Sequence, residues 1–297
     1  MSLVYNLARG ASSIAGWTPQ GIRHNLGSVA SGASYLGWRS KRIVTQQNMA
    51  QVTGLPVHDP RVRYLAYASW RNYGRYAADF LSFAHVDASM IEPRTLDLTR
   101  GAGGWLEYVK QALQPGRGAL FVTSHFGNWD MAGAMMARHV RISAVAETFS
   151  DQKLNELVQN QRREKGIDII PMESSARRIL RALHGNQFVG IVFDRPMPAG
   201  EGTPVRFFGR KTYVPAGTAT LAIKSGAAIM PGYFWYGHHN QFYVRAFPPI
   251  FPRQAKGEEQ AAEVARLTQY LFDTMEEVVR EWPTQWYMFR PFWPLEI

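Results

Sequence analysis

From residue 119 onward, short apolar runs alternate with segments of helical periodicity, and this alternation limits the possible folds more than any other feature of the chain. Runs such as Leu120–Thr123 and Phe188–Phe193 are typical of strands buried on both faces. Segments such as Asp151–Glu164 and Ser174–Leu183 have the spacing of helices. The pattern predicts an α/β fold with a mostly parallel central sheet flanked by helices. The other expected strands are Arg141–Ala146, Asp168–Pro171, Ala227–Tyr236 and Gln241–Phe247, and the other expected helices are Met131–Arg138, Pro215–Ser225 and Ala261–Glu281.

The first 112 residues have a different character, because they are helical in pattern and basic. Breaks occur at residues 54–57 and at Glu92-Pro93, where glycine and proline interrupt the periodicity. No repeat, low-complexity tract or linker divides the chain. We therefore expect one domain over residues 1–297, with a helical N-terminal portion over 1–112 and an α/β catalytic core over 113–297.

Composition narrows the classes of protein. Hydrophobic residues make up 46% and charged residues 19%, as in a chain that folds. The absence of cysteine excludes disulfides, thiolate metal sites and a cysteine nucleophile. A formal net charge of +10 suits anionic partners, namely nucleic acid, an anionic membrane leaflet or phosphate-bearing ligands. No apolar run approaches the ~20 residues of a membrane span, and the N-terminus lacks the basic region of a signal peptide.

The stretch GALFVTSHFGNWD, residues 118–130, places a histidine at the end of a predicted strand. Ligands of open α/β sheets bind beyond the carboxyl ends of strands, which is where His125 falls. Gly127 and Asn128 favour a turn, and Asp130 opens the next helix. We expect Asp130 to accept a hydrogen bond from one ring nitrogen of His125 and leave the other as a base for a substrate hydroxyl. The same residues also fit a turn histidine followed by a helix cap.

The block His125-Phe-Gly-Asn-Trp-Asp130 resembles the H-x4-[DE] motif of the glycerolipid acyltransferase superfamily. It is most similar to the HFGNW[DE] form of bacterial late lipid A acyltransferases and mycobacterial phosphatidylinositol mannoside acyltransferases. The resemblance continues from about residue 40 to the end of the chain. It includes the segment GWRSKRIVTQQNMAQVTG, the pair Asp194-Arg195, the segment VRFFGRK and the closing block PTQWYMF.

This resemblance implies acyl transfer, in which His125 deprotonates a lipid or glycolipid hydroxyl that attacks the thioester of acyl-CoA or acyl-carrier protein. It implies catalytic roles for His125, Asp130 and Glu201, although Pro196, Pro198 and Pro204 depart from the family's pattern around Glu201. No cofactor is implied beyond the acyl donor. The residues expected to bind substrate are Glu147, Arg162, Arg163, Asp194, Arg195, Asn128, Phe126 and Trp129.

Other readings of these residues stay open. Arg162 or Arg163 could form bidentate bonds to a phosphate or lie on a solvated helix face, and Asp194-Arg195 could be a strand-end ion pair. Asp194 should lie beside the first strand of the core if the strand order is the usual one. Phe126 and Trp129, with Met131, Met135 and Met136, would line an acyl groove or simply fill the core.

The expected location is the cytoplasmic face of the inner membrane, with the protein bound peripherally to an anionic surface through its basic N-terminal portion. A thioesterase that directs the same dyad at water is one alternative. A basic protein that binds nucleic acid or an anionic membrane without catalysis is another, but no RNP, KH, helix-turn-helix or zinc pattern occurs. We expect no nucleic-acid partner and no metal, since no HxxxH or HExxH spacing is present.

Overall fold

The computed structural model describes residues 3–238, 241–254 and 256–294. Its strands are β1 (Thr95–Asp97), β2 (Ala119–Thr123), β3 (Ile142–Ala146), β4 (Ile167–Pro171), β5 (Phe188–Val192), β6 (Thr203–Phe207), β7 (Arg210–Val214), β8 (Ala228–Tyr236) and β9 (Phe242–Ala246). Its α-helices are α1 (Leu3–Trp17), α2 (Gln20–Gly37), α3 (Arg39–Thr53), α4 (Pro60–Leu81), α5 (Gly104–Leu113), α6 (Trp129–Met136), α7 (Gln152–Glu164), α8 (Ser175–His184), α9 (Gly217–Ser225) and α10 (Glu258–Glu281). Short 3₁₀ turns are η1 (Phe83–His85), η2 (Ala88–Met90), η3 (Glu92–Arg94), η4 (Met172–Ser174) and η5 (Pro283–Gln285).

The main sheet has seven strands in the order β1-β9-β8-β2-β5-β3-β4. The pairs β2–β5, β2–β8, β3–β4, β3–β5 and β1–β9 are parallel, and β8–β9 is antiparallel. The predicted α/β class with a mostly parallel sheet is therefore confirmed. Strand β5 lies directly beside β2, as the sequence led us to expect, with Thr123 opposite Val192 at the end of the ladder.

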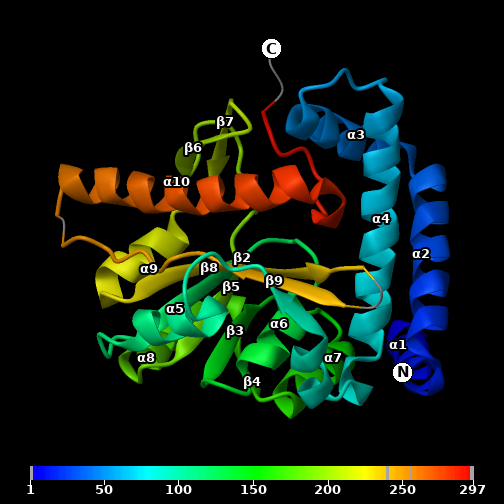
Figure 1. The fold of residues 1–297 in the computed structure, drawn as a ribbon, viewed down its shortest axis with the longest axis horizontal. Helices are drawn as coiled ribbons and strands as arrows, with labels where there is room; N and C mark the ends of the chain where they lie inside the picture. Colours follow the sequence, from blue (N-terminus) through cyan, green and yellow to red (C-terminus); the bar gives the residue numbers. More distant parts are fainter. Residues whose placement is uncertain (1–2, 239–240, 255, 295–297) are drawn as a thin grey trace.

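Side chains of β2 alternate between two apolar layers, because successive residues of a strand point to opposite faces. Leu120 and Val122 join a cluster with apolar residues of α8, α9 and α10, whereas Ala119 and Phe121 join a second cluster with α5 and α6. Figure 1 shows α10 crossing one side of the sheet, with α5 and α6 on the other side. A strand covered on both faces explains the continuous apolar run in its sequence.

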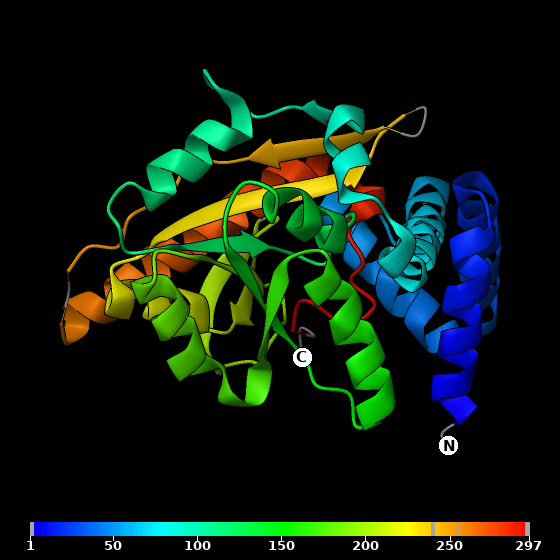
Figure 2. The ribbon, with the colours of Figure 1, turned by 90° about the horizontal axis from the view of Figure 1, so that it is seen from below.

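The N-terminal helices pack beside the carboxyl end of the sheet, where α2 and α4 run side by side (Figures 1 and 2). A Cβ built on Gly27 would lie 2.2 Å from the carbonyl oxygen of Gly74, so the two helix backbones are in direct contact. Close contact of this kind requires glycine at both positions. It places α4 against the residues that follow β2.

A two-stranded antiparallel hairpin, β6–β7, is an element that the predicted strands do not include. Its strands are joined by Phe208 and Gly209, both with positive φ (48° and 74°), as in the two-residue turns that suit hairpins. The side chain of Phe207 is fully buried between Trp286 and Trp293. The hairpin thus anchors the C-terminal segment.

Candidate active site

His125 and Asp194 meet at the carboxyl ends of the neighbouring strands β2 and β5. The ring Nδ1 of His125 lies 2.8 Å from Asp194 Oδ1, and the backbone N–H of His125 donates to the same oxygen at 3.0 Å. The second oxygen, Oδ2, accepts a hydrogen bond from Trp286 Nε1 at 3.0 Å. Asp194 is completely buried, and three donors surround its charge, which is how a buried carboxylate is tolerated.

This geometry fixes the tautomer of the imidazole. A carboxylate accepts only, so Nδ1 of His125 carries the proton and Nε2 is a free base when the ring is neutral. Burial opposes charging of the ring, but the Asp194 carboxylate and its hydrogen bond outweigh burial, and the pKa of His125 lies above its ordinary value of 6.5. The side chain keeps 39% of its surface accessible, so the base can be reached by a substrate.

Asp130 holds a different position from the one predicted. Its Oδ1 accepts a hydrogen bond from Arg162 Nε at 2.7 Å, and its Oδ2 accepts one from Tyr76 O–H at 2.8 Å. The ring of His125 is hydrogen-bonded to Asp194 and not to Asp130. The predicted His125–Asp130 pair is therefore wrong, because α4 and α7 draw the Asp130 carboxylate toward themselves.

The same contacts correct the expectation for the two arginines. Arg162 is mostly buried and is committed to Asp130, Gln159 and the ring of Phe80, so it is not a free phosphate ligand. Arg163 is exposed and donates to Asn160 on its own helix. Arg162 instead ties α7 to the start of α6.

The turn after β2 depends on Gly127, which has a φ of +62°. A Cβ at this position would lie 2.1 Å from the carbonyl oxygen of Phe234 in β8. The backbone N–H of Asn128 donates to that same oxygen at 2.8 Å. The turn is thus pressed against β8 with no room for a side chain.

We expect Gly127→Ala to lower the free energy of unfolding by roughly 2–4 kcal/mol, through overpacking and a strained φ together. Gly209→Ala is the matched control, since Gly209 has a similar φ of +74° and open space around its Cα. It should cost only about 1 kcal/mol. Urea unfolding of both variants makes the comparison, and equal losses would contradict the close packing described here.

The C-terminal segment closes the turn from the other side. The backbone N–H of Tyr287 donates to His125 O, and that of Gly127 donates to Gln285 O, both at 2.8 Å. Asn48 of α3 in turn holds the segment, donating from Nδ2 to the carbonyls of Met288 and Arg290. The closing block is therefore a structural support of the histidine.

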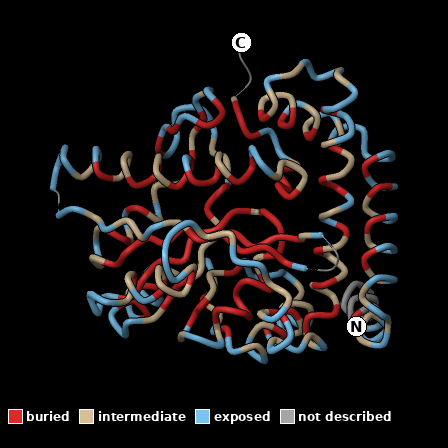
Figure 3. The backbone as a smooth tube through the Cα atoms, viewed as in Figure 1, coloured by how far each residue is buried: buried red, intermediate tan, exposed pale blue. Residues whose placement is uncertain are grey.

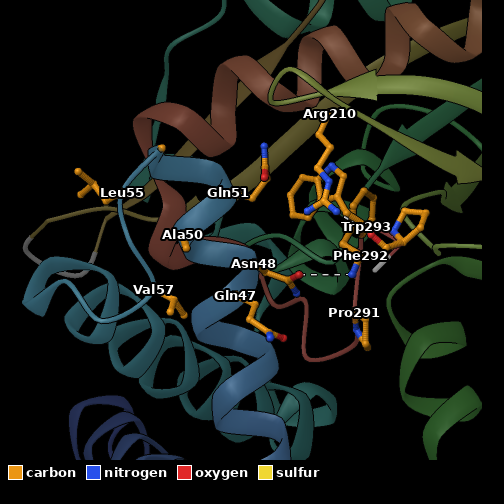
Figure 4. A pocket seen from close by; sticks show the side chains of 12 residues that line it. Gln47, Asn48, Ala50, Gln51, Leu55, Val57, Arg210, Pro291, Phe292 and Trp293 are labelled. Carbon is orange, nitrogen blue, oxygen red and sulfur yellow. Dashed lines mark hydrogen bonds between the residues drawn. The ribbon is translucent and has the colours of Figure 1, made fainter. Parts of the chain in front are cut away.

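A cavity of about 420 Å³ lies between α3 and this segment, and Figure 4 shows the side chains that line it. Its walls include Gln51, Arg210 and Trp293, and His125 is not among the residues that line it. Asn48 Oδ1 accepts the backbone N–H of Phe292 at its edge, at 3.3 Å. The cavity is thus separate from the dyad.

Charged groups surround the open side of His125. Glu147 and Arg195 form an ion pair, and the hydrogen bond from Arg195 lowers the pKa of Glu147. The guanidinium groups of Arg195 and Arg290 act against the charging of His125. A negative charge placed here would lie beside these two guanidinium groups.

The other predicted residues divide into supports and core. Asn128 caps α6, accepting the backbone N–H of Met131 at Oδ1. Trp129 is half-buried, with its ring 5.4 Å from that of His125. Phe126 is fully buried between Tyr233 and Trp235, so the alternative of a core residue is the correct one for it. Met131, Met135 and Met136 are likewise core residues.

Glu201 lies on an exposed turn before β6, where its backbone N–H donates to Pro198 O at 3.0 Å. Within the described parts of the chain, its side chain has no hydrogen bond or ion pair. The structure therefore does not join Glu201 to the dyad. The same described parts hold no cluster of three His, Asp or Glu side chains suited to a metal ion, and none of their helices is long and apolar enough to cross a bilayer.

Sequence reasoning missed Trp286, Tyr76 and Arg290 as parts of the site. Trp286 falls in the closing block PTQWYMF, so the resemblance pointed to its segment but not to its contact with Asp194. Nothing in the local sequence signals Tyr76 or Arg290, because each reaches the site from a distant segment.

Sequence comparison relates the chain to known proteins. Residues 8–294 match the sequence model of the bacterial lipid A biosynthesis acyltransferase family. The chain is 30% identical over 272 residues to a phosphatidylinositol mannoside acyltransferase of Mycobacterium tuberculosis, covering 89% of this chain and 80% of that protein. It is 27% identical over 275 residues to a phosphatidylinositol mannoside acyltransferase of Mycolicibacterium smegmatis, covering 90% and 84%. The chain therefore belongs to the bacterial lipid A biosynthesis acyltransferase family and is an acyltransferase.

Proposed function

We propose that this enzyme moves a fatty acyl chain from acyl-CoA or acyl-carrier protein to a hydroxyl of a glycolipid. The acceptor resembles phosphatidylinositol mannoside, the substrate named for the relatives, or alternatively a lipid A precursor, named by the family. The observation that carries the proposal is the His125–Asp194 pair, in which the His125 side chain is 39% exposed and no serine of the described residues is hydrogen-bonded to the ring. The chain contains no cysteine. A base of this kind needs its nucleophile from the substrate.

The chemical step follows from the geometry. His125 Nε2 takes the proton of the acceptor hydroxyl as its oxygen attacks the thioester carbonyl, and Asp194 stabilises the imidazolium that forms. The tetrahedral intermediate then collapses, the C–S bond breaks, and the imidazolium returns the proton to the departing thiolate. The products are an ester and a free thiol, and no acyl-enzyme forms.

Positive charge supports the intermediate. Arg195 and Arg290 lie near enough to His125 to influence its titration, and both side chains reach the surface. Cations held beside a developing oxyanion stabilise it without reorganising during the reaction. Glu147, paired with Arg195, fixes the direction of one of these cations.

The test is the release of thiol from acyl-CoA, measured with and without phosphatidylinositol mannoside or a lipid A precursor, with mass spectrometry of the lipid product. Acyl transfer requires that thiol release depend on the acceptor and that the acceptor gain one acyl chain. Thiol release at the same rate without acceptor would instead identify a thioesterase. If neither acceptor gave thiol release from acyl-CoA, the proposal would be rejected.

We also propose that the enzyme works while bound peripherally to the cytoplasmic leaflet of the inner membrane, where thioester donors are found. Helix α2 supports this, because it buries a small or polar face and exposes an apolar one. His24, Ser28 and Gly32 face α4, whereas Leu26 and Val29 are 64% and 66% exposed. Figure 3 shows the buried side of α2 turned toward α4 and its exposed side turned outward.

The exposed stripe on α2 comprises Ile22, Leu26, Val29 and Leu36, and Trp17 and Trp38 stand at the two ends of the helix. Exposed Arg39 follows directly, and the chain carries a net charge of +10. Apolar side chains with tryptophan and cations at the ends suit a helix that lies in an anionic interface.

Replacing Leu26 and Val29 with Asp should weaken binding to phosphatidylglycerol vesicles by roughly 10- to 100-fold, because two aliphatic side chains that would insert into the lipid are removed. The matched control replaces Leu96 and Phe251, also exposed apolar residues, with Asp. Sedimentation with vesicles measures both. An equal effect of the two double variants would assign binding to charge alone and contradict docking through α2.

A further inference from the structure

Asp79 of α4 is a buried carboxylate that the acyl-transfer step does not use. It is 1% exposed and accepts three hydrogen bonds from three different elements. His24 of α2 contacts Oδ1 at 2.7 Å, while Tyr236 O–H and Asn128 Nδ2 contact Oδ2 at 2.7 and 3.2 Å. A buried charge with these partners joins α2, α4, β8 and the start of α6 at one point.

The contact with Asn128 sets the direction of an amide. Because Asp79 accepts only, the NH₂ group of Asn128 must face it, and Oδ1 then faces the end of α6. There Oδ1 accepts the backbone N–H of Met131 at 3.1 Å and caps the helix. The hydroxyl oxygen of Tyr236 accepts the second amide hydrogen at 2.9 Å, so two contacts fix the orientation of the amide.

Helix α4 contacts the same turn through a second side chain. Tyr76, one turn before Asp79, donates to Asp130, two residues after Asn128. Two side chains of α4, Tyr76 and Asp79, therefore hold the segment that follows His125. The backbone of His125 itself is bonded to Asp194 and to the C-terminal segment.

We propose that Asp79, held in place by His24, is a positioning residue for the His125 turn, and that it acts by orienting Asn128. The kinetic part of this inference rests on the proposed acyl transfer. Since His24 lies on the buried face of α2 and the apolar stripe lies on the opposite face, the helix that would dock on lipid also sets the alignment of the base.

The test pairs a disruptive variant with its suppressor. Asn128→Asp places two buried carboxylates together, where only one can stay ionised without cost, and should lower kcat by roughly 100-fold while changing KM little. Adding Asp79→Asn restores the pairing with the roles exchanged, because the amide at position 79 then donates to the carboxylate at position 128. The double variant Asp79→Asn/Asn128→Asp should therefore recover to within about 10-fold of the parent. Ser28→Ala, which removes another α2–α4 hydrogen bond, is the control and should leave kcat unchanged.

A spectroscopic readout separates this inference from the proposed function. The Nδ1–H proton of His125, bonded to Asp194, should give a downfield NMR signal that is absent from His125→Ala. It should be lost or shifted in Asn128→Asp and restored in the double variant, whether or not acyl transfer is observed. A signal unchanged in Asn128→Asp, or equal losses in the single and double variants, would overturn the proposal.

If Asn128→Asp does not fold, His24→Leu and His24→Gln make the same comparison. Glutamine keeps a donor for Asp79 and should preserve the signal and kcat, whereas leucine should diminish both. Equal behaviour of these two variants would also overturn the proposal.

Discussion

His125→Ala should lower acceptor-dependent acyl transfer by at least roughly 10²- to 10⁴-fold, the usual contribution of a general base. The loss should appear in kcat, because the ring acts on the reacting hydroxyl rather than on either substrate's remote parts. The side chain is 39% exposed, and its backbone bonds to Tyr287 and Asp194 remain after truncation, so the fold should persist. Steady-state kinetics together with thermal unfolding make the measurement.

His184→Ala is the control for this variant, since His184 is an exposed residue at the end of α8, next to the start of β2 and not to its carboxyl end. Its activity should equal that of the parent. If His125→Ala retained full kcat with an unchanged KM, the base would have to be another group.

Asp194→Asn should lower kcat by a comparable 10²- to 10⁴-fold factor, roughly as expected for a base held in the wrong tautomer. An amide has to satisfy three donors with one oxygen, the ring and backbone of His125 and the indole of Trp286. Whichever way it turns, an NH₂ group faces a former donor. The imidazole then either loses its partner or accepts at Nδ1, and Nε2 becomes protonated and useless as a base.

Stability should also fall in Asp194→Asn, because Asp194 is completely buried and a mismatched donor there is unsatisfied. Arg162→Lys gives a useful contrast. It keeps a cation near Asp130 but loses the Nε bond, and it should reduce stability more than it reduces kcat, since Arg162 does not contact His125. The reverse pattern in the two variants would contradict the assignment of the dyad.

The fold was predictable because its main cause is local. Strands β2 and β5 carry buried side chains on both faces, and the continuous apolar runs in their sequences indicate this burial. The hairpin β6–β7 was not found, because its positions alternate between buried and exposed over only five residues per strand. Its turn also uses Phe208 at positive φ, which no rule of turn composition favours.

The place of His125 at the end of a strand was predictable, and the partner of its ring was not. Two aspartates are candidate partners for His125, one five residues later in the chain and one just after the neighbouring strand β5. The sequence favoured Asp130 because it is close to His125 along the chain. Asp194 comes close only through the pairing of β2 with β5, which the sequence suggests but does not establish. The decision depends on Tyr76 and Arg162, which capture Asp130 from α4 and α7, and these contacts span more than 30 residues of chain.

The pH dependence of kcat/KM for acyl transfer in the parent, Asp194→Asn and Asp130→Asn tests the central claim most directly. His125 must be neutral to act, and its pKa is raised by Asp194, so activity in the parent should fall as the pH drops through a value above 6.5. Asp194→Asn removes that attraction and leaves burial, Arg195 and Arg290 to lower the pKa, so its acid limb should move to lower pH. Asp130→Asn should leave the acid limb in place. An acid limb that moves with Asp130→Asn and stays fixed with Asp194→Asn would contradict the His125–Asp194 dyad.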